Sequence, residues 1–468
     1  MKEFLLKHAA KDPVSFHMPG HKGSEIFRKY GFGDVLDNIV DMDVTEIPGA
    51  DNLFQTEGII KSVQDQYARL YDVKHSYLQI NGSSGGIIAA ILACVPPGKK
   101  LIMARNCHKS VFNALTLGHI EPAYARPELL EEKGVMGQVE PAEIERLLSA
   151  NPDAEAVILP SPNYYGICSD IEAIAKVVHD AGKVLIIDQA HGAHLKFFHK
   201  FGLGDGMPKC AEDCGADIVI NSIHKTLAAL TQSALLNVTS DRVDVRVRED
   251  KLQAIESTSP SYILMTFLAL NAELLEKHGA QAIGEWKENL LYFYEQAADI
   301  SGLELMSACG RMDITKINLD MGSIGINGAE LEEMLMEHDI FSELYTGDIL
   351  MLMTGIGNTR THMDRTLKAL RQISETARDN TTRPVKKIAA VPPMGILHSV
   401  PRKKAYVSLD DAVGRICAGS IIPYPPGIPF ICPGEEITAE AASYIKSLRL
   451  EGEKVIGVTD DGQVAVGV

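Results

Sequence analysis

Four short runs of branched apolar residues, each ending in polar or turn residues, divide the first two-thirds of this 468-residue chain. They lie at residues 101–103, 157–159, 184–187 and 218–220, and segments with helical periodicity separate them. One such segment, 171–181, stops before a glycine, a common helix terminator. Nearly continuous apolar strands that alternate with helices form parallel sheets covered on both faces. The sequence therefore predicts an α/β domain with a mainly parallel sheet.

The pattern changes beyond about residue 300. Residues 315–320 alternate apolar and polar side chains like a half-buried strand, 328–338 have helical periodicity, and 349–354 form another apolar strand. These elements indicate a smaller α+β subdomain. Residues 378–395 mix charges with proline and glycine, as a linker does. The stretch 424–430 contains too many prolines for a regular element.

Composition and charge narrow the class of protein. The chain is 46% hydrophobic and 23% charged, so it can bury a large core and is not a disordered protein. Its 62 acidic residues against 45 basic ones give a net charge of −17, which argues against a nucleic-acid partner and suits cationic small molecules. Neither a signal peptide nor an apolar run long enough to span a membrane is visible. We expect a soluble, cytoplasmic protein without a membrane partner.

The eight cysteines are sparse and form no CxxC pair. Cys210 and Cys214 resemble half of a zinc site, but no second pair completes it. Two closely spaced histidine pairs lack an HExxH pattern, and the glycines near them favour tight packing. We expect reduced thiols and no metal site.

The strongest catalytic signal is Lys225, at the end of the tetrapeptide SIHK (222–225) that follows the strand at 218–220. In α/β sheets, ligands bind at the carboxyl ends of strands. A lysine desolvated there has a lowered pKa and can form a Schiff base with an aldehyde. The alternative reading of Lys225 alone is an exposed loop lysine.

Asp188 gives the second signal, because it directly follows the strand at 184–187. A carboxylate at a buried strand end is costly unless it meets a cation. The ring nitrogen of pyridoxal phosphate becomes such a cation, and the pairing keeps the ring an electron sink. The alternative is an aspartate that caps the next helix. Asp188 and Lys225 each follow a strand, as a shared cofactor site requires.

Two further segments suit a phosphorylated aromatic ligand. NGSSGG (81–86) precedes a helical run, and small residues at a helix start let backbone N–H groups and the helix dipole bind a phosphate. Ser83 and Ser84 can add hydroxyl donors. His108, within NCHKS (106–110), can stack on a cofactor ring. Taken singly, the first segment is also typical of a helix cap, and the second of a structural histidine.

Along the chain the four signals occur as a phosphate turn, a stacking histidine, a strand-end aspartate and a strand-end lysine. In that order they resemble the fold type I pyridoxal phosphate enzymes, and more narrowly the ornithine/lysine/arginine decarboxylase family in its shorter bacterial form. The resemblance extends over nearly the whole chain, and FHMPGHK, SIHKTL and YPPGIP are its most specific parts. The matching stretches are FHMPGHK (16–22), DVTEIPGADNL (43–53), NGSSGG (81–86), NCHKS (106–110), SPNYYG (161–166), DQAHGAH (188–194), SIHKTLAALTQSA (222–234), STSPSY (257–262), GRI (414–416) and YPPGIP (424–429).

The resemblance implies a role for each candidate residue. Lys225 would bind the cofactor covalently, Asp188 would pair with the ring nitrogen, and His108 would stack on the ring. His191 would lie near the ring hydroxyl or the substrate carboxylate. Thr258, with its neighbour Ser257, would reach the phosphate in the neighbouring subunit, since the family's sites lie at a dimer interface. The remaining phosphate ligands would be Ser83, Ser84, Ser222 and His224.

The resemblance also implies the architecture. Residues 1–300 would form an N-terminal segment and an aspartate-aminotransferase-like large domain, 301–380 a small α+β subdomain, and 381–468 a linker and a C-terminal α+β domain. Long relatives carry an additional response-regulator-like domain that helps to build large rings. FHMPGHK starts at residue 16, which leaves no room for that domain and puts ring assembly in doubt. We expect a homodimer with shared active sites and leave a higher oligomer open.

The function implied is decarboxylation of a basic L-amino acid, with arginine ahead of lysine and then ornithine. An aminotransferase or a carbon–carbon lyase on the same fold is the alternative, followed by a non-catalytic cofactor-binding regulatory protein. The substrate's distal cation would need an acidic partner. Asp51 and Asp411 are the candidates, although relatives often carry glutamate in the segment that contains Asp411.

Overall fold

A seven-stranded, mainly parallel sheet forms the centre of the computed structural model, which describes residues 1–130, 133–306, 311–379, 395, 397–424, 429–450, 452 and 454–468. The strand order is β2-β10-β9-β8-β7-β3-β4, and β10 alone runs antiparallel to its neighbours. The predicted α/β fold is thereby confirmed. The strands are β2 (His75–Gln79), β3 (Lys100–Ala104), β4 (Glu121–Ala125), β7 (Ala154–Pro160), β8 (Val184–Asp188), β9 (Ile218–Asn221) and β10 (Ala234–Val238).

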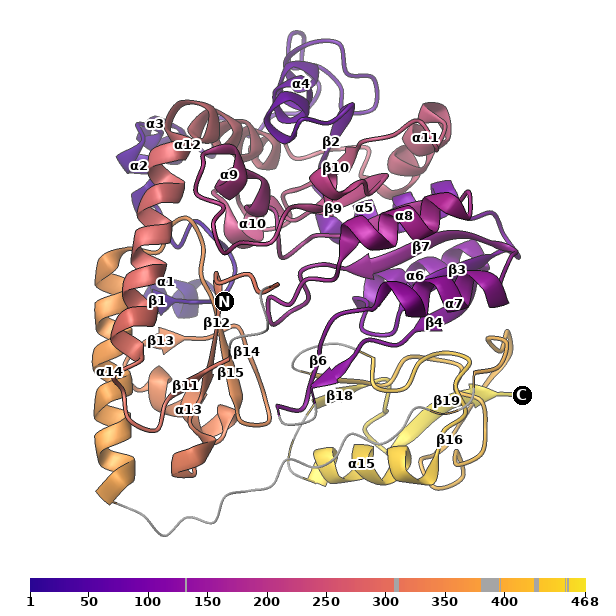
Figure 1. Ribbon diagram of the computed structural model, residues 1–468. Coiled ribbons are helices and arrows are strands. Elements are labelled where there is room, and N and C mark those ends of the chain that lie inside the picture. The colour runs from indigo at the N-terminus through magenta and orange to yellow at the C-terminus, as the bar shows by residue number, and fades with distance from the viewer. Residues whose placement is uncertain are drawn as a thin grey trace.

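Helices cover both faces of this sheet (Figure 1). α5 and α6 pack against each other behind the sheet in this view, and α7 and α8 pack against each other in front of it. Because both faces are covered, the strands are continuous apolar runs, and the structure extends each predicted run by one to four residues. These helices are α5 (Gly82–Cys94), α6 (Lys109–Gly118), α7 (Pro141–Ala150), α8 (Ile171–Asp180) and α11 (Val245–Ile255).

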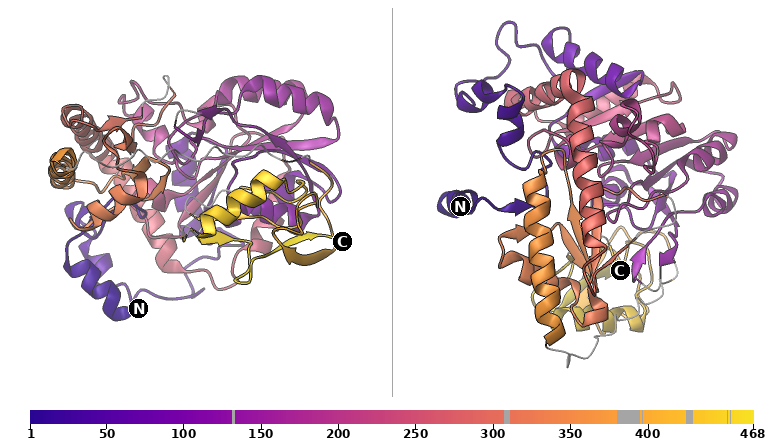
Figure 2. Two further views of the ribbon diagram at one scale, coloured as in Figure 1. Left: turned by 90° about the horizontal axis from the view of Figure 1, so that it is seen from below. Right: turned by 60° about the vertical axis from the view of Figure 1, so that its left-hand side comes forward.

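Shorter elements connect the sheet to the rest of the chain. They are α1 (Lys2–Ala10), α2 (Glu25–Lys29), α3 (Gly33–Asp37), α4 (Ile59–Tyr71), β5 (Leu129–Leu130), β6 (Val135–Met136), α9 (Leu195–Lys200), a 3-10 helix at Ala211–Cys214, α10 (Ile223–Thr226) and a 3-10 helix at Gly322–Ile324. Helix α1 buries none of its residues and stands apart from the body in the second view of Figure 2. Its surface is thus available to a partner.

A second sheet, four-stranded and antiparallel, has the order β11-β12-β15-β14. α13 packs on its strands and on α14, and β1 near the N-terminus pairs in parallel with β13. The N-terminal segment therefore adds a strand to this smaller α+β subdomain. Its elements are β1 (Val14–Ser15), β11 (Glu304–Leu305), β12 (Lys316–Asp320), α13 (Gly328–Met336), β13 (Ile340–Phe341), β14 (Leu344–Thr346), β15 (Ile349–Met353) and α14 (Arg360–Asp379).

Strand β12 differs from the half-buried strand that alternation predicted. Lys316 and Asn318, at polar positions of that pattern, are as buried as their apolar neighbours. Lys316 forms an ion pair with Asp313, and Asn318 donates its side-chain amide to the backbone carbonyl of Tyr165 over 2.9 Å. Buried polar groups are tolerated when they are hydrogen-bonded. The prediction of a solvent-facing side was therefore wrong.

One long helix, α12 (Tyr262–Ala297), runs from the large sheet to the small subdomain (Figure 1). It contacts α4 and α9 on one side of the molecule and α14 on the other. Its buried face extends from Tyr262 to Ala297 and includes Trp286. The helix thereby joins the two parts through one continuous element.

The C-terminal part has its own apolar core between α15 and two short antiparallel ribbons. The ribbons pair β16 (Lys404–Ser408) with β19 (Gln463–Gly467), and β17 (Ile422–Tyr424) with β18 (Lys454–Ile456). Helix α15 spans Ala439–Leu450. Strand β17 enters the predicted irregular stretch at Tyr424, and residues 425–428 lie outside the described ones. The predicted linker begins inside the last turn of α14, and 380–394 are also outside the described residues.

Within the described ranges, no helix has the length and apolar character needed to cross a membrane.

Arg105, just after β3, attaches the C-terminal part to the large domain. Its guanidinium donates to both carboxylate oxygens of Glu435, over 2.6 and 2.7 Å, and to the carbonyl of Phe430. Both side chains of the pair are almost fully buried. Tyr124 adds a hydrogen bond from its hydroxyl to the carbonyl of Pro433. Removing one partner of such a pair leaves an uncompensated buried charge.

We predict that Arg105→Met weakens the attachment of the C-terminal part by about 3–5 kcal/mol. The double variant Arg105→Met/Glu435→Gln recovers part of this loss, because no unpaired charge then remains buried. Calorimetric unfolding of the three proteins measures the effect. Lys99→Met is the control: it breaks the exposed pair with Glu155 at the other end of β3 and changes stability by less than about 1 kcal/mol. Equal losses in both single variants would contradict the prediction.

Candidate active site

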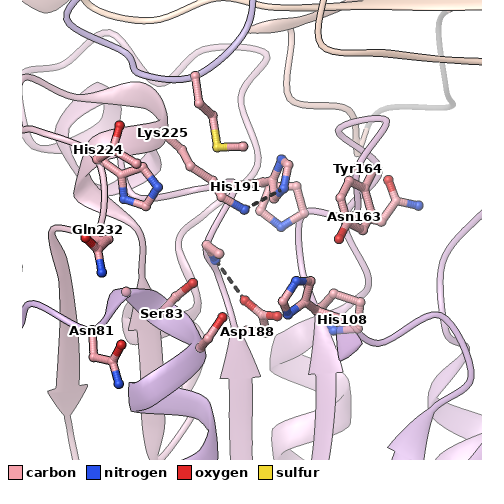
Figure 3. Close-up of a pocket in the computed structure, with 17 residues that line it drawn as sticks. Asn81, Ser83, His108, Asn163, Tyr164, Asp188, His191, His224, Lys225 and Gln232 are labelled. Atoms are coloured by element: carbon pink, nitrogen blue, oxygen red, sulfur yellow. Dashed lines mark hydrogen bonds between the residues drawn. The ribbon is translucent and has the colours of Figure 1, made fainter. Parts of the chain in front are cut away.

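A cavity of about 280 Å³ opens where strands of the central sheet end (Figure 3). β7 and β8 are parallel neighbours, and β8 and β9 are too, so their carboxyl ends lie at one edge of the sheet. The turns that follow these strands place their side chains around a common space. Of the residues predicted from the sequence, the structure brings these to the cavity wall: Ser83, Ser84, His108, Asp188, His191, His224 and Lys225.

Lys225 lies on the short helix α10, and its Nζ is 3.0 Å from Nε2 of His191. Burial lowers the pKa of Lys225, while the nearby carboxylate of Asp188 opposes this shift. Burial, reinforced by the charge of Lys225, holds the pKa of His191 well below its usual value, so its imidazole is neutral. A charged Lys225 can only donate, so Nε2 accepts and Nδ1 carries the proton. The arrangement gives a desolvated amine beside a proton acceptor.

The Nδ1 atom of His191 is buried and has no hydrogen-bond partner within the described part of the chain. The ring of Tyr164 lies beside that of His191, with 4.8 Å between the ring centroids. A buried, unpaired N–H is costly unless a ligand or water satisfies it. His191 thus offers a hydrogen-bond donor to something that binds here.

Asp188 is the last residue of β8 and is 5% exposed. One carboxylate oxygen accepts from the backbone N–H of Ala190 over 3.1 Å, and no cation of the described residues forms an ion pair with it. Burial raises the pKa of Asp188, an effect that the charge of Lys225 partly offsets. A buried carboxylate in this situation is stabilised by a cation, such as a protonated ring nitrogen.

A buried polar network fixes the strand ends that carry these residues. Gln189 donates its amide to Glu212 and to Asn221, over 2.8 and 2.9 Å, and accepts from the backbone of Ala211. Asn221 and Asn237 donate to the other oxygen of Glu212. Every carboxylate oxygen and amide involved has a partner, so the network is rigid. It holds the ends of β8 and β9 in fixed register.

His108 caps the N-terminus of α6. The backbone N–H of Ser110 donates to Nδ1 of His108 over 3.2 Å, and the Ser110 hydroxyl lies 2.8 Å from the same nitrogen. Nδ1 is therefore the acceptor, and Nε2 carries the proton. Burial, and then the charges of Lys225 and Lys109, lower the pKa of His108 to about 3. The neutral ring stands on the cavity wall beside Asp188, where an aromatic ligand can stack on it (Figure 3).

The start of α5 forms the anion-binding end of the cavity. Ser83 and Ser84 lie in the first turn of this 13-residue helix, and the N-cap residue Asn81 makes no side-chain capping hydrogen bond. Gly82 has a positive φ of 69°, and its N–H donates to the carbonyl of Gln232. Free N–H groups at a helix start attract a phosphate.

His224 lines the same cavity as Ser83 and Ser84, and Ser222 is the N-cap residue of the short helix α10 that carries His224. Nδ1 of His224 donates to the carbonyl of Ser233 over 2.9 Å, and burial lowers the pKa of His224 to about 4. The hydroxyls of Ser222 and Ser233 are buried without a hydrogen-bond partner in the described structure. An oxyanion at this point would satisfy such hydroxyls.

These features fit pyridoxal phosphate. Its phosphate suits the start of α5, its protonated ring nitrogen suits Asp188, and its aldehyde suits the amine of Lys225. The orphaned Nδ1 of His191 and hydroxyl of Ser222 supply donors for its oxygens. Among the described residues, no cluster of three His, Cys, Asp or Glu side chains could hold a metal ion instead.

Five predicted residues lie outside the cavity lining of this chain, and one of them, Ser222, is the buried N-cap residue of α10. Ser257 and Thr258 are exposed after α11, and Asp411 is exposed in the C-terminal part, where its carboxylate accepts from the hydroxyl of Ser408. Asp51 accepts from the backbone N–H groups at the start of α4, including that of Gly58 over 2.8 Å. Burial would raise the pKa of Asp51, but these N–H groups together lower it. Its role in substrate binding, like that of Asp411, stays a prediction.

Several residues of the cavity were missed in the sequence. Met18, Tyr164 and Gln232 line it, and all three belong to stretches that carry the family resemblance, so a signal was present. Glu343 has no such signal. One of its carboxylate oxygens accepts from the backbone N–H of Met18 over 3.0 Å, and its charge opposes the lowering of the Lys225 pKa by burial. Lys316 lies behind the wall and donates to the carbonyl of His191.

Comparison with known proteins shows the family of this chain. Residues 1–318 match the family described as Orn/Lys/Arg decarboxylase, major domain, and residues 375–463 match its C-terminal domain. The chain is 31% identical over 474 residues to the arginine decarboxylase of Halalkalibacterium halodurans, covering 98% of this chain and 94% of the relative.

Solved structures show the same fold. Lysine decarboxylase A from Pseudomonas aeruginosa superposes with a TM-score of 0.77 at 20% identity, covering 99% of this chain and 80% of that one. Alanine–glyoxylate aminotransferase from Nostoc superposes with a TM-score of 0.57 at 16% identity, over 73% of this chain and 92% of that one. The protein thus has the α/β architecture of fold type I pyridoxal phosphate enzymes, and by its sequence it belongs to the Orn/Lys/Arg decarboxylase family.

Proposed function

We propose that this protein is a pyridoxal-phosphate-dependent decarboxylase of basic L-amino acids, with arginine as the preferred substrate, and that its product amine enters polyamine biosynthesis. One observation carries the proposal: the desolvated amine of Lys225 and the uncompensated carboxylate of Asp188 face the same cavity from adjacent strand ends. The relative that covers 98% of the chain is an arginine decarboxylase, which favours arginine.

Each residue of the cavity has a task in this reaction. Bound pyridoxal phosphate supplies an aldehyde that binds amines and a ring that accepts the electron pair left on the substrate carbon when carbon dioxide departs. Asp188 holds the proton on the ring nitrogen, and the neutral imidazole of His108 stacks on the ring and fixes its plane. The start of α5 with Ser83 and Ser84 holds the phosphate, assisted by the hydroxyl of Ser222. His224 donates to the phosphate once Nε2 carries a proton, which the negative charge of a bound phosphate favours.

Lys225 and His191 hold and deliver the proton that replaces the carboxylate on the substrate carbon. Their Nζ and Nε2 atoms are 3.0 Å apart, so a proton can pass between them. The low pKa of His191 keeps Nε2 unprotonated, so Nε2 accepts a hydrogen bond from Nζ while the proton stays on Lys225. Lys225 can then deliver a proton to the substrate carbon, and Nδ1 of His191 remains available to orient a substrate or cofactor oxygen.

We further propose that the active unit is a cytoplasmic homodimer with shared sites. Phe4, Leu5 and Leu6 on α1 are 71%, 54% and 61% exposed, and a second copy of the chain would cover them. Thr258 lies two residues after Glu256. The carboxylate of Glu256 accepts a hydrogen bond from the backbone N–H of Asn81, at the start of α5. The exposed Thr258 is therefore near a phosphate site at the surface that a partner would cover. Six of the described cysteines form no disulfide bond, as suits a reducing compartment; they are Cys107, Cys168, Cys210, Cys214, Cys417 and Cys432.

The direct test is an assay of the purified holoenzyme with arginine, lysine, ornithine and norleucine. We expect carbon dioxide release from arginine with the highest kcat/KM, and for norleucine a value on the order of 10⁴-fold lower, because it leaves the distal pocket's polar groups unpaired. Carbon dioxide and amine are quantified together. Keto-acid formation without carbon dioxide would identify an aminotransferase, and equal turnover of norleucine would refute specificity for basic amino acids.

The two central residues should respond differently to substitution. Borohydride reduction should attach the cofactor to the peptide that contains Lys225, and Lys225→Ala should abolish this attachment. Asp188→Asn should retain the attachment but lower kcat by about 10²–10³-fold, because the neutral amide no longer stabilises the protonated ring. Peptide mass spectrometry and steady-state kinetics make the comparison. Attachment to another lysine, or normal turnover in Asp188→Asn, would overturn the assignment of that residue.

Shared sites predict complementation between two inactive chains. In a mixture of Lys225→Ala with Thr258→Asp, half of the dimers are hybrids with one intact site of two, so activity should recover to about a quarter of wild type. The control mixes Lys225→Ala with Asp188→Asn, two changes within one chain's site, which no hybrid can repair. Subunit exchange is followed by mass spectrometry. Exchange without recovery in the first mixture would exclude a shared site involving Thr258.

A further inference from the structure

A ring of hydrogen bonds closes behind the cavity wall and connects Lys225 with His191. It begins at Thr226, the residue after Lys225, and passes through His194, Asp313 and Lys316 to the backbone carbonyl of His191. These four side chains are completely buried. None of them lines the cavity, so the ring lies behind the residues that face it.

Lys316 has all three ammonium protons engaged. It donates to the carboxylate of Asp313 over 2.7 Å, to the hydroxyl of Thr315 over 3.2 Å, and to the carbonyl of His191. A lysine with every donor satisfied by protein is not available to bind a ligand. Its bond to the His191 carbonyl instead fixes the peptide that carries the imidazole facing Lys225.

Asp313 and His194 complete the ring on the other side. Nε2 of His194 lies 3.1 and 3.2 Å from the two oxygens of Asp313, and a carboxylate can only accept, so Nε2 donates. Nδ1 must then accept from the hydroxyl of Thr226, 3.1 Å away. Burial lowers the pKa of His194, which keeps its ring neutral. Burial would raise the pKa of Asp313, but His194 and Lys316 hold it far below its usual range.

The ring also joins two parts of the molecule. Lys316 and Asp313 belong to the small subdomain, at and before the start of β12, whereas His194 and Thr226 belong to the large domain. The backbone N–H of Asp313 donates to the carbonyl of Gly166 over 2.8 Å, so its own position is fixed against the large domain. The small subdomain thus supplies the support for two residues of the cavity.

A buried ion pair is a poor source of stability, because apolar residues of similar volume often stabilise a core equally well. The ion pair of Lys316 with Asp313 therefore needs another explanation. The hydrogen bonds of the pair lead to His191 on one side and, through His194 and Thr226, to Lys225 on the other. We propose that Lys316, with Asp313 and His194, is a positioning residue that sets the Nζ–Nε2 contact between Lys225 and His191. The inference rests on the proposed function in one respect, the cofactor on Lys225.

The charge of Lys316 also acts on the cavity. It lowers the pKa values of Lys225 and His191, in addition to the larger effect of burial. Removing Lys316 should therefore move the titration of the lysine–cofactor linkage to higher pH. The other charged or titratable groups around Lys225 are Asp188, Glu343, His108, His191 and His224.

The test uses the double variant Lys316→Met/Asp313→Asn, which leaves no unpaired buried charge and keeps the side-chain volumes. If the ring positions the site, the melting temperature stays within a few degrees of wild type, while kcat falls about 10²-fold with little change in KM. The pH titration of the bound cofactor's absorbance shifts upward by less than about one unit, because the loss of the Lys316 cation is partly offset by the loss of the Asp313 carboxylate. This spectroscopic readout does not depend on turnover.

The control is Lys133→Met, which breaks the 2.7 Å pair between Lys133 and Asp320 at the far end of β12. It should leave both kcat and the absorbance titration unchanged. Wild-type kcat and titration in the double variant would overturn the proposal, as would a loss of folding or of cofactor, because the ring would then be merely structural. If the wild-type protein released no carbon dioxide, the proposed function would fail, while the absorbance titration would still test Lys316.

Discussion

The active site depends on the parallel pairing of β8 with β9. This pairing aligns Asp188 with Ile220, so that the carboxylate at the end of one strand and the lysine one turn beyond the other reach the same space. No cation of the described residues forms an ion pair with the buried carboxylate, whose burial the charge of Lys225 offsets only in part, and Nδ1 of His191 and the hydroxyl of Ser222 are buried without a partner among these residues. Burying these polar groups costs free energy, and this cost is offset when a ligand binds to them. The Gln189–Glu212–Asn221 network maintains this arrangement.

The large domain could be predicted from the sequence because its strands are covered on both faces. Branched apolar runs such as 184–187 have no amphipathic alternative. The polar residues that follow the runs 184–187 and 218–220 mark the edge of the sheet where ligands bind. Asp188 and Lys225 were identifiable for this reason. The ends of the strands were less predictable: β7 begins at Ala154, three residues before its apolar run, because backbone pairing does not require a branched side chain.

The supporting residues could not be predicted. Lys316 occupies a polar position of an alternating pattern, which is typical of a solvent-facing side chain, and only the docking of β12 against the DQAHGAH segment buries it. Glu343 comes from a loop of the small subdomain and reaches Met18 across more than 300 residues of sequence. Asp51 is the opposite case. It lies in a stretch that matches the family, but its carboxylate accepts hydrogen bonds from backbone N–H groups at the start of α4. Sequence spacing does not show which of these polar side chains is buried or what it contacts, because tertiary contacts decide both.

Helix α12 has a mechanical consequence. Its 36 residues form one unbroken helix, which turns between its part near α4 and its part beside α14, and residues buried at both of its ends anchor it to the two parts of the molecule that it joins (Figure 1). An unbroken helix contains no flexible loop, so the small subdomain cannot swing freely about this connection when substrate enters. Access must then come from smaller movements of loops at the cavity mouth, or from the way two chains meet. The spatial relation between Lys316 and the residues that it supports is therefore established when the chain folds, before any substrate binds.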